Sequence, residues 1–150
     1  MTVTPNSVVT PQLPRNAAVQ IANTDGTNLK ALVVGAASGT KVSAIGACNT
    51  DTAAYTLQLV RNIGGSNSGG TVTGGTNYPL ASVALAASAG NVAGTPPVGV
   101  MTTATIPGIA VDSTGSPYLY VNAGEFLCVA LTSAVSAGKF VSAQATAADF

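Results

Sequence analysis

The side chains that most often carry out chemistry in enzymes are scarce in this chain. It contains no histidine, and its only acidic residues are Asp25, Asp51, Asp112, Glu125 and Asp149. Histidine is the commonest general base, the usual activator of Ser and Cys nucleophiles, and the commonest metal ligand. A glycosidase-type carboxylate pair would have to converge mostly from segments that resemble turns or chain ends. We therefore expect no enzymatic activity, no cofactor and no metal site.

Three short segments contain residue types that can bind ligands, and each is predicted to be a plain turn or loop. The segment Asn23–Asn28 resembles an oxygen-rich calcium loop, but it offers one carboxylate and lacks the later bidentate Glu. The glycine pairs between 64 and 75 are not followed by the Gly-Lys-Ser/Thr of a phosphate loop. Glu125 is expected in a solvated turn, and pairing with Arg15 or Arg61 of a neighbour is the alternative.

The two cysteines, Cys48 and Cys128, stand far apart in the sequence and outside any Cys-x-x-Cys pair. Two buried free thiols are the favoured interpretation, because unpaired Cys is among the most buried residue types. A single disulfide joining two strands stays open as the alternative.

The composition points to a folded chain with little charge on its surface. Hydrophobic residues make up 47% of the chain, charged residues 7%, and the formal net charge is zero. An ordinary soluble domain carries about 25% charged residues. The missing charge is explained either by a Ser/Thr/Asn-rich surface or by faces that contact other subunits. Without a basic stripe or a long apolar run, neither nucleic acid nor a membrane is expected as a partner, and no signal peptide is expected.

The chain is predicted to consist of an extended N-terminal arm, 1–16, followed by a single β-domain, 17–150. Pro5, Pro11 and Pro14 remove backbone donors from the arm and favour extended conformations. The low-complexity stretch 62–77 contains several glycine pairs, and we expect it to be a long, mobile surface loop.

Short β-type runs separated by turn residues favour an antiparallel β-sandwich, jelly-roll-like, over any helical fold. Alternation of apolar residues is clearest around Tyr55–Leu59 and Phe126–Leu131. Tyr78–Ala89 is interpreted as a strand, with a short helix as the alternative. Further strands are expected at Ala17–Ala22, Leu29–Val34, Thr40–Ala47, Thr102–Pro107, Tyr118–Val121 and Gly138–Ala145.

The four tyrosines, Tyr55, Tyr78, Tyr118 and Tyr120, have two interpretations. Packing in the core with each hydroxyl at the rim is favoured, most strongly for Tyr55. The alternative is an exposed aromatic platform for sugars or another surface ligand.

Two parts of the sequence carry a resemblance to a known class of protein. The opening Met1–Gln12, with its Thr-Pro and Val-Val pairs, and the closing Tyr118–Leu131 and Gly138–Phe150, with the Gly-Glu turn before an apolar strand, resemble small virion proteins encoded near the capsid genes of tailed bacteriophages. The likeness covers about a third of the chain, and its motifs are short.

The resemblance implies a non-enzymatic capsid decoration, or cement, protein. Such a protein is a homotrimer that binds the major capsid protein on the outside of the shell and is assembled in the bacterial host cytoplasm. A head-fibre or receptor-binding module and a neck or tail joint protein are the alternatives.

The predicted arm is the candidate attachment segment. Its apolar side chains can anchor an extended peptide on a partner surface. The predicted contact residues are Val3, Val8, Val9, Leu13 and Arg15.

Overall fold

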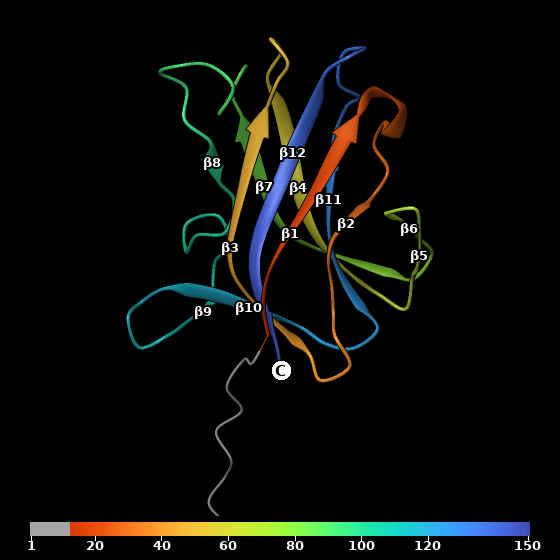
Figure 1. Ribbon diagram of the computed structural model, residues 1–150, viewed down its shortest axis with the longest axis vertical. Coiled ribbons are helices and arrows are strands. Elements are labelled where there is room, and N and C mark those ends of the chain that lie inside the picture. The colour runs from red at the N-terminus through yellow and green to blue at the C-terminus, as the bar shows by residue number, and fades with distance from the viewer. Residues whose placement is uncertain (1–12) are drawn as a thin grey trace, which may run out of the picture.

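Two antiparallel β-sheets packed face to face make up the fold of the computed structural model, which describes residues 13–150 (Figure 1). In the first sheet, called sheet A, the strand order is β1-β12-β3-β10-β9, and β8 also pairs with β3. In the second, sheet B, the order is β5-β6-β2-β11-β4-β7. The predicted antiparallel β-sandwich is confirmed.

The strand bounds of sheet A are β1 Leu13–Ala22, β3 Thr40–Asn49, β8 Val98–Gly99, β9 Ala110–Val111, β10 Pro117–Val121 and β12 Phe140–Asp149. Those of sheet B are β2 Lys30–Val34, β4 Tyr55–Ile63, β5 Ser66–Ser68, β6 Thr71–Thr73, β7 Thr76–Leu85 and β11 Glu125–Leu131. The 3₁₀ turn η1 (Asn23–Asp25) lies in the connection between β1 and β2.

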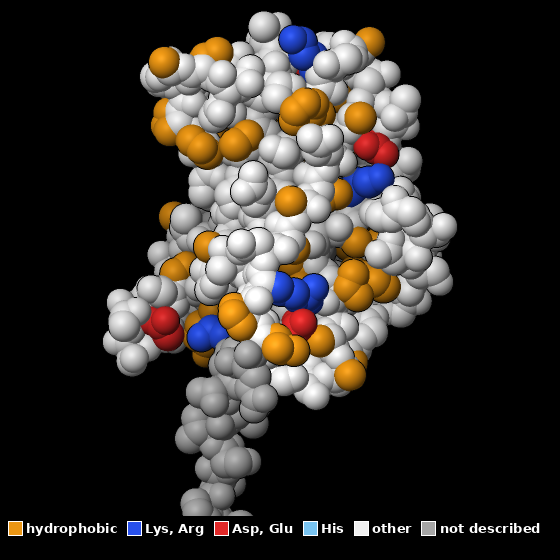
Figure 2. Space-filling model, viewed as in Figure 1, with side chains coloured by type: hydrophobic (Ala, Val, Ile, Leu, Met, Phe, Trp, Pro, Cys, Tyr) orange, Lys and Arg blue, Asp and Glu red, His pale blue; other side chains and the backbone are white. Residues whose placement is uncertain are grey.

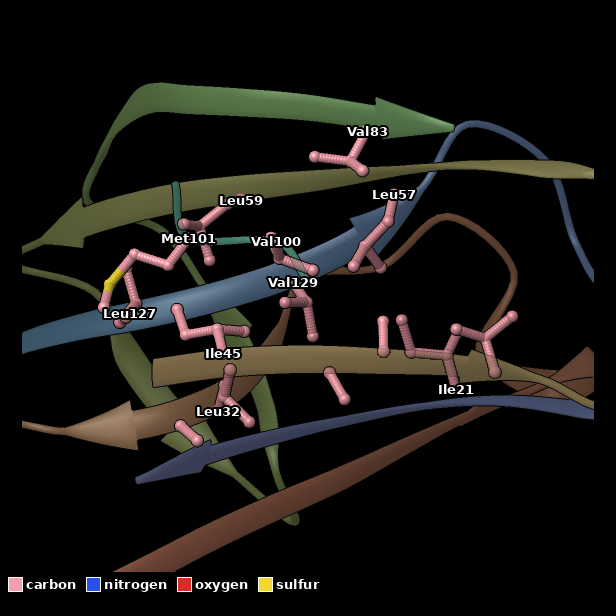
Figure 3. Close-up of a cluster of buried hydrophobic side chains, with 14 of the residues drawn as sticks. Ile21, Leu32, Ile45, Leu57, Leu59, Val83, Val100, Met101, Leu127 and Val129 are labelled. Carbon is pink, nitrogen blue, oxygen red and sulfur yellow. The ribbon is translucent and has the colours of Figure 1, made fainter. Parts of the chain in front are cut away.

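The hydrophobic core lies between the sheets and is built from the inward side chains of both (Figure 3). Leu57 and Leu127 come from sheet B and Ile21 from sheet A, and all three are almost completely buried. Each such side chain contributes about 1.5–3 kcal/mol when it leaves water. Strand β11 is buried along its whole length, because it lies at the centre of sheet B.

The predicted arm is too long, because Leu13–Asn16 belong to strand β1. These four residues pair with β12, from Leu13 opposite Asp149 to Asn16 opposite Thr146. Pro14 fits there because β1 is the edge of sheet A, where one side of the strand needs no donor.

The Gly-rich stretch 62–77 is a folded hairpin and not a long mobile loop. Strands β5 and β6 pair with each other, and Val72 of β6 is buried beside Phe126. Gly69 and Gly70 both have positive φ in the tight turn between the two strands. Glycine pairs therefore mark turns in this segment, while the Ser and Thr residues between them form strands.

Two other strand predictions had opposite outcomes. The strand predicted at Tyr78–Ala89 is confirmed as β7, which ends at Leu85, and the helical alternative is wrong. Thr102–Pro107 forms turns instead of the predicted strand. There Thr105 Oγ1 donates to the carbonyl of Val100, and such side-chain bonds compete with a strand ladder.

Candidate functional site

Asp25, which lies in the turn after β1, forms hydrogen bonds within its own chain. Asp25 accepts hydrogen bonds from the Ala22 amide at 2.8 Å and from Lys30 Nζ at 3.0 Å. The Ala22 amide and Lys30 hold the pKa of Asp25 below its ordinary value. This carboxylate therefore closes the turn between β1 and β2.

Asp51 lies at the centre of a buried polar network. Its carboxylate accepts hydrogen bonds from the Tyr55 hydroxyl at 2.6 Å and from the Ser136 amide at 2.8 Å. These donors stabilise the ionised form and hold the pKa of Asp51 far below its ordinary value. The network joins the β3–β4 connection to the loop before β12, and we assign it a structural role.

Replacing Tyr55 by Phe should destabilise the fold and reduce its sensitivity to acid. A hydrogen bond to a charged group contributes about 2 kcal/mol, so we expect a loss of that size at pH 7. Because folding lowers the pKa of Asp51, its ionised form stabilises the protein above the unfolded-state pKa of about 3.9. This stabilisation is lost as the pH falls below that value.

Urea unfolding at pH 7 and pH 3 measures both effects. The decrease in unfolding free energy between the two pH values should be smaller in Tyr55→Phe than in the wild type. Tyr78→Phe is the matched control, because the Tyr78 side chain is largely exposed. Equal losses in the two variants would show that the Asp51 network is not a stabilising element.

Glu125 is buried, so the predicted solvated turn is wrong in its exposure. Its carboxylate accepts hydrogen bonds from the amide and side chain of Asn122, at 3.0 and 3.1 Å. Arg61 of the same chain, not of a neighbour, lies 3.8 Å away. Glu125 is buried because it is the first residue of β11, a central strand of sheet B.

Residues 13–150 contain no group of three or more metal-ligating side chains. No helix in the same residues is long and apolar enough to cross a membrane.

The predicted attachment residues fall into two groups. Val3, Val8 and Val9 lie outside the described residues. Leu13 is 66% exposed at the start of β1. Arg15 is engaged within its own chain.

Arg15 links the two sheets at the end of the sandwich where β1 begins. It forms an ion pair with Asp149 at 3.0 Å and donates to the carbonyl of Val34 at 2.7 Å. It also donates to the hydroxyl of Thr40, which is completely buried. Arg15 therefore holds the two sheets together within its own chain, and its contact with a partner stays a prediction.

Cys48 and Cys128 are both free thiols, so the disulfide alternative is wrong. Cys128 is completely buried in sheet B, and burial raises its pKa to about 12. Cys48 lies on β3 and is only half-buried, beneath the loop that contains Gly90. The prediction of two buried thiols thus holds for Cys128 alone.

This difference predicts the labelling of one thiol per folded chain. A disulfide reagent at pH 8 should modify Cys48, because attack requires a thiolate that the reagent can reach. Cys128 should react only after unfolding in denaturant. Absorbance titration with and without denaturant measures the two stoichiometries, and a Cys48→Ser variant should show no native labelling. Two thiols reacting at equal rates in the folded protein would contradict this arrangement.

The outer surface of sheet A is the most distinctive surface of the molecule, and we call it the A face. Its side chains alternate with the buried ones along β1, β12, β3 and β10, and the strand register aligns them in rows. The A face consists of Pro14, Asn16, Ala18, Gln20, Lys41, Ala44, Gly46, Tyr118, Tyr120, Ser142, Gln144, Thr146 and Ala148. Lys41 is its charged residue.

The A face is hollowed, and its middle carries little charge. Ala18, Ala44 and Gly46 help line a shallow hollow of about 460 Å³ at its centre. Figure 2 shows the middle of this side of the molecule as mostly uncharged, with blue and red side chains at the top, along the right-hand margin and in the lower third of the view. Small side chains at a hollow allow another backbone to approach closely.

Aromatic rings gather at the end of the A face where both described chain ends lie. The rings of Tyr118 and Tyr120 are 5.2 Å apart, and the ring of Phe150 lies 5.6 Å from that of Tyr120. Lys41 Nζ lies 4.7 Å from the centre of the Tyr118 ring, a cation–π contact. The single charge of the A face is thus placed over an aromatic ring.

The tyrosines divide between the two interpretations made from the sequence. Core packing is confirmed for Tyr55. It is wrong for Tyr78 and Tyr120, which are 49% and 45% exposed. Tyr78 lies on the edge strand β7, whereas Tyr120 projects from the outer surface of sheet A, away from the core.

Sequence reasoning missed the A face, although its signal is present. Ala17–Ala22 and Gly138–Ala145 each alternate an inward apolar residue with a small or polar one and carry no acidic residue. Only the strand order shows that these segments are neighbours and that their outward residues form one surface.

Comparison with protein-family models, with curated proteins and with solved structures found no match.

Proposed function

We propose that this protein is a non-enzymatic structural protein of a phage virion that binds the outside of the capsid and stabilises it as a decoration protein. The observation that carries the proposal is the A face, a broad surface with one charged residue. Such a surface suits permanent contact between subunits, because the centres of interfaces are depleted of charge.

The size of the A face fits contact with a second copy. Four neighbouring strands span roughly 19 Å and ten residues of strand roughly 33 Å, so the face covers about 600 Å². A stable interface uses about 800 Å² per partner, and the adjoining loops can supply the rest. Three copies that turn this face toward a common axis would form the proposed homotrimer.

The jelly roll is the finer fold that we propose. The eight longest strands, in chain order, are β1, β2, β3, β4, β7, β10, β11 and β12. When they are numbered one to eight in that order, the strand order is 1-8-3-6 in sheet A and 2-7-4-5 in sheet B. This alternation of strands between two four-stranded sheets supports the double Greek-key connectivity of that class.

Attachment to the major capsid protein is assigned to Met1–Gln12, through Val3, Val8 and Val9. A protein that binds only the assembled shell stabilises it by mass action against disassembly. The proposed place of action is therefore the capsid surface, after folding in the bacterial cytoplasm.

Two measurements test the proposal. Light scattering coupled to size exclusion should give a native mass near three times 14.6 kDa. Purified full chain should then co-sediment with expanded capsids that lack their decoration protein. A chain that is monomeric and does not bind such shells would overturn the proposal.

The exposure of Tyr78 and Tyr120 supports a second candidate, a receptor-binding module of a head fibre that recognises sugars. A glycan array probed with the wild type and with Tyr120→Ala tests it. Binding that is lost in the variant would favour this function over decoration.

A further inference from the structure

A groove lies at the side of the sandwich where the edge of sheet A comes close to the edge of sheet B. It has a volume of about 410 Å³ and lies between β10, β7 and the segment 106–110. Its lining is mostly apolar and includes Leu80, Ile109 and Tyr120. Ligand sites in proteins start at about 300 Å³ and have this kind of lining.

The groove also offers donors for a peptide backbone. Arg61 of β4 reaches across to sheet A, where its guanidinium donates to the carbonyl of Tyr120 at 2.7 Å. Its side chain remains 29% exposed and lines the groove together with Asn122. An apolar groove with a guanidinium and an amide at its side suits an uncharged, extended peptide, whose carbonyl groups need donors.

The chain contains such a peptide, and it ends close to the groove. Met1–Gln12 has no charged side chain, and it contains Val8-Val9 and two prolines. It joins the fold at Leu13, opposite Asp149. The next residue, Phe150, packs on Tyr120, which lines the groove. A path of aromatic side chains therefore connects the start of β1 with the groove.

The spacing selects Val8-Val9 as the part of the segment that reaches the groove. β10 is three strands from β1, which corresponds to roughly 14 Å. Val8 and Val9 precede Leu13 by five and four residues, a reach of about 13–17 Å in an extended chain. Attachment to the same chain also gives the segment a high effective concentration at the groove.

The geometry points to Met1–Gln12 docking in the groove of its own chain, with Val8-Val9 packed against Leu80, Ile109 and Tyr120. This inference goes beyond the proposed function, because it describes the free protein. The segment assigned to shell attachment is then held on the subunit until a shell competes for it.

Hydrogen exchange of the full chain tests the docking. If the segment is docked nine-tenths of the time, its amides should exchange about tenfold more slowly than those of a free peptide of the same sequence. Ala110→Glu fills the groove from an exposed position and should restore the free rates. Val111→Glu is the matched control, because the neighbouring exposed residue lies outside the groove lining.

Two results would overturn the inference. Free exchange rates in the wild type would show that nothing docks. Protection that disappears when Ala18→Arg abolishes self-association would place the segment on a neighbouring copy instead of its own chain.

Shell binding separates this inference from the proposed function. Releasing a segment that is free one-tenth of the time should raise apparent shell affinity about tenfold in Ala110→Glu. If no variant binds shells while wild-type protection persists, the proposed function fails and the docking stands.

Discussion

Ala18→Arg is expected to convert the proposed homotrimer to a folded monomer with a native mass of 14.6 kDa. Ala18 is exposed midway along the edge strand β1 of the A face, on the wall of its hollow. In the free chain an arginine there projects into water, so the unfolding free energy should change by less than about 0.5 kcal/mol. In the assembled oligomer the same guanidinium would be buried without a partner, which costs several kcal/mol. We expect the dissociation constant to rise at least 100-fold.

Ala84→Arg provides the matched control for this experiment. Ala84 is also an exposed alanine on an edge strand, but β7 lies in sheet B on the opposite side of the sandwich. Light scattering at several concentrations, together with urea unfolding, separates dissociation from misfolding. If Ala18→Arg keeps the native mass of the wild type, the A face is not the interface, and the proposed function loses the observation that carries it.

The sequence was sufficient to predict the sandwich because the core strands carry the period-2 signal. In β4, buried Leu57 and Leu59 alternate with less buried residues, and in β11 Leu127 and Val129 belong to a continuous buried apolar run. Turns rich in Gly, Asn and Asp separate the strands. The same rule failed where side chains satisfy the backbone locally, as Thr105 does in the segment predicted to be a strand.

The candidate site could be predicted only in part, because it depends on which strands are neighbours. β1 and β12 lie at opposite ends of the chain and are paired along their full lengths. Their outward residues, such as Ala18 and Gln144, are unremarkable singly and form an uncharged surface only together. The burial of Glu125 likewise reflects the central position of β11 in sheet B, which the local turn motif does not report.

Because strand β1 begins at Leu13, two N-terminal deletions that differ by four residues should differ strongly in stability. Deleting Met1–Gln12 should leave the sandwich folded, while deleting Met1–Asn16 should lower the unfolding free energy by about 2–4 kcal/mol more. The longer deletion removes the ladder between Leu13 and Asn16 and all the bonds made by Arg15. Each lost hydrogen bond costs about 1 kcal/mol, and the partly exposed ion pair with Asp149 adds at most about 1 kcal/mol.

Urea unfolding of the two deletions and of Arg15→Ala in the full chain apportions this loss. The shorter deletion should cost no more than about 1.4 kcal/mol, the stabilisation that a tenfold docking equilibrium provides. Arg15→Ala should cost less than the longer deletion, because the β1 ladder remains and only the links to Asp149, Val34 and Thr40 are lost. Equal stability of the two deletions would show that Leu13–Asn16 contribute nothing to the sandwich. The shorter deletion keeps strand β1 and therefore an intact sheet A. If this variant is soluble but no longer binds shells, the lost binding is due to Met1–Gln12 and not to misfolding.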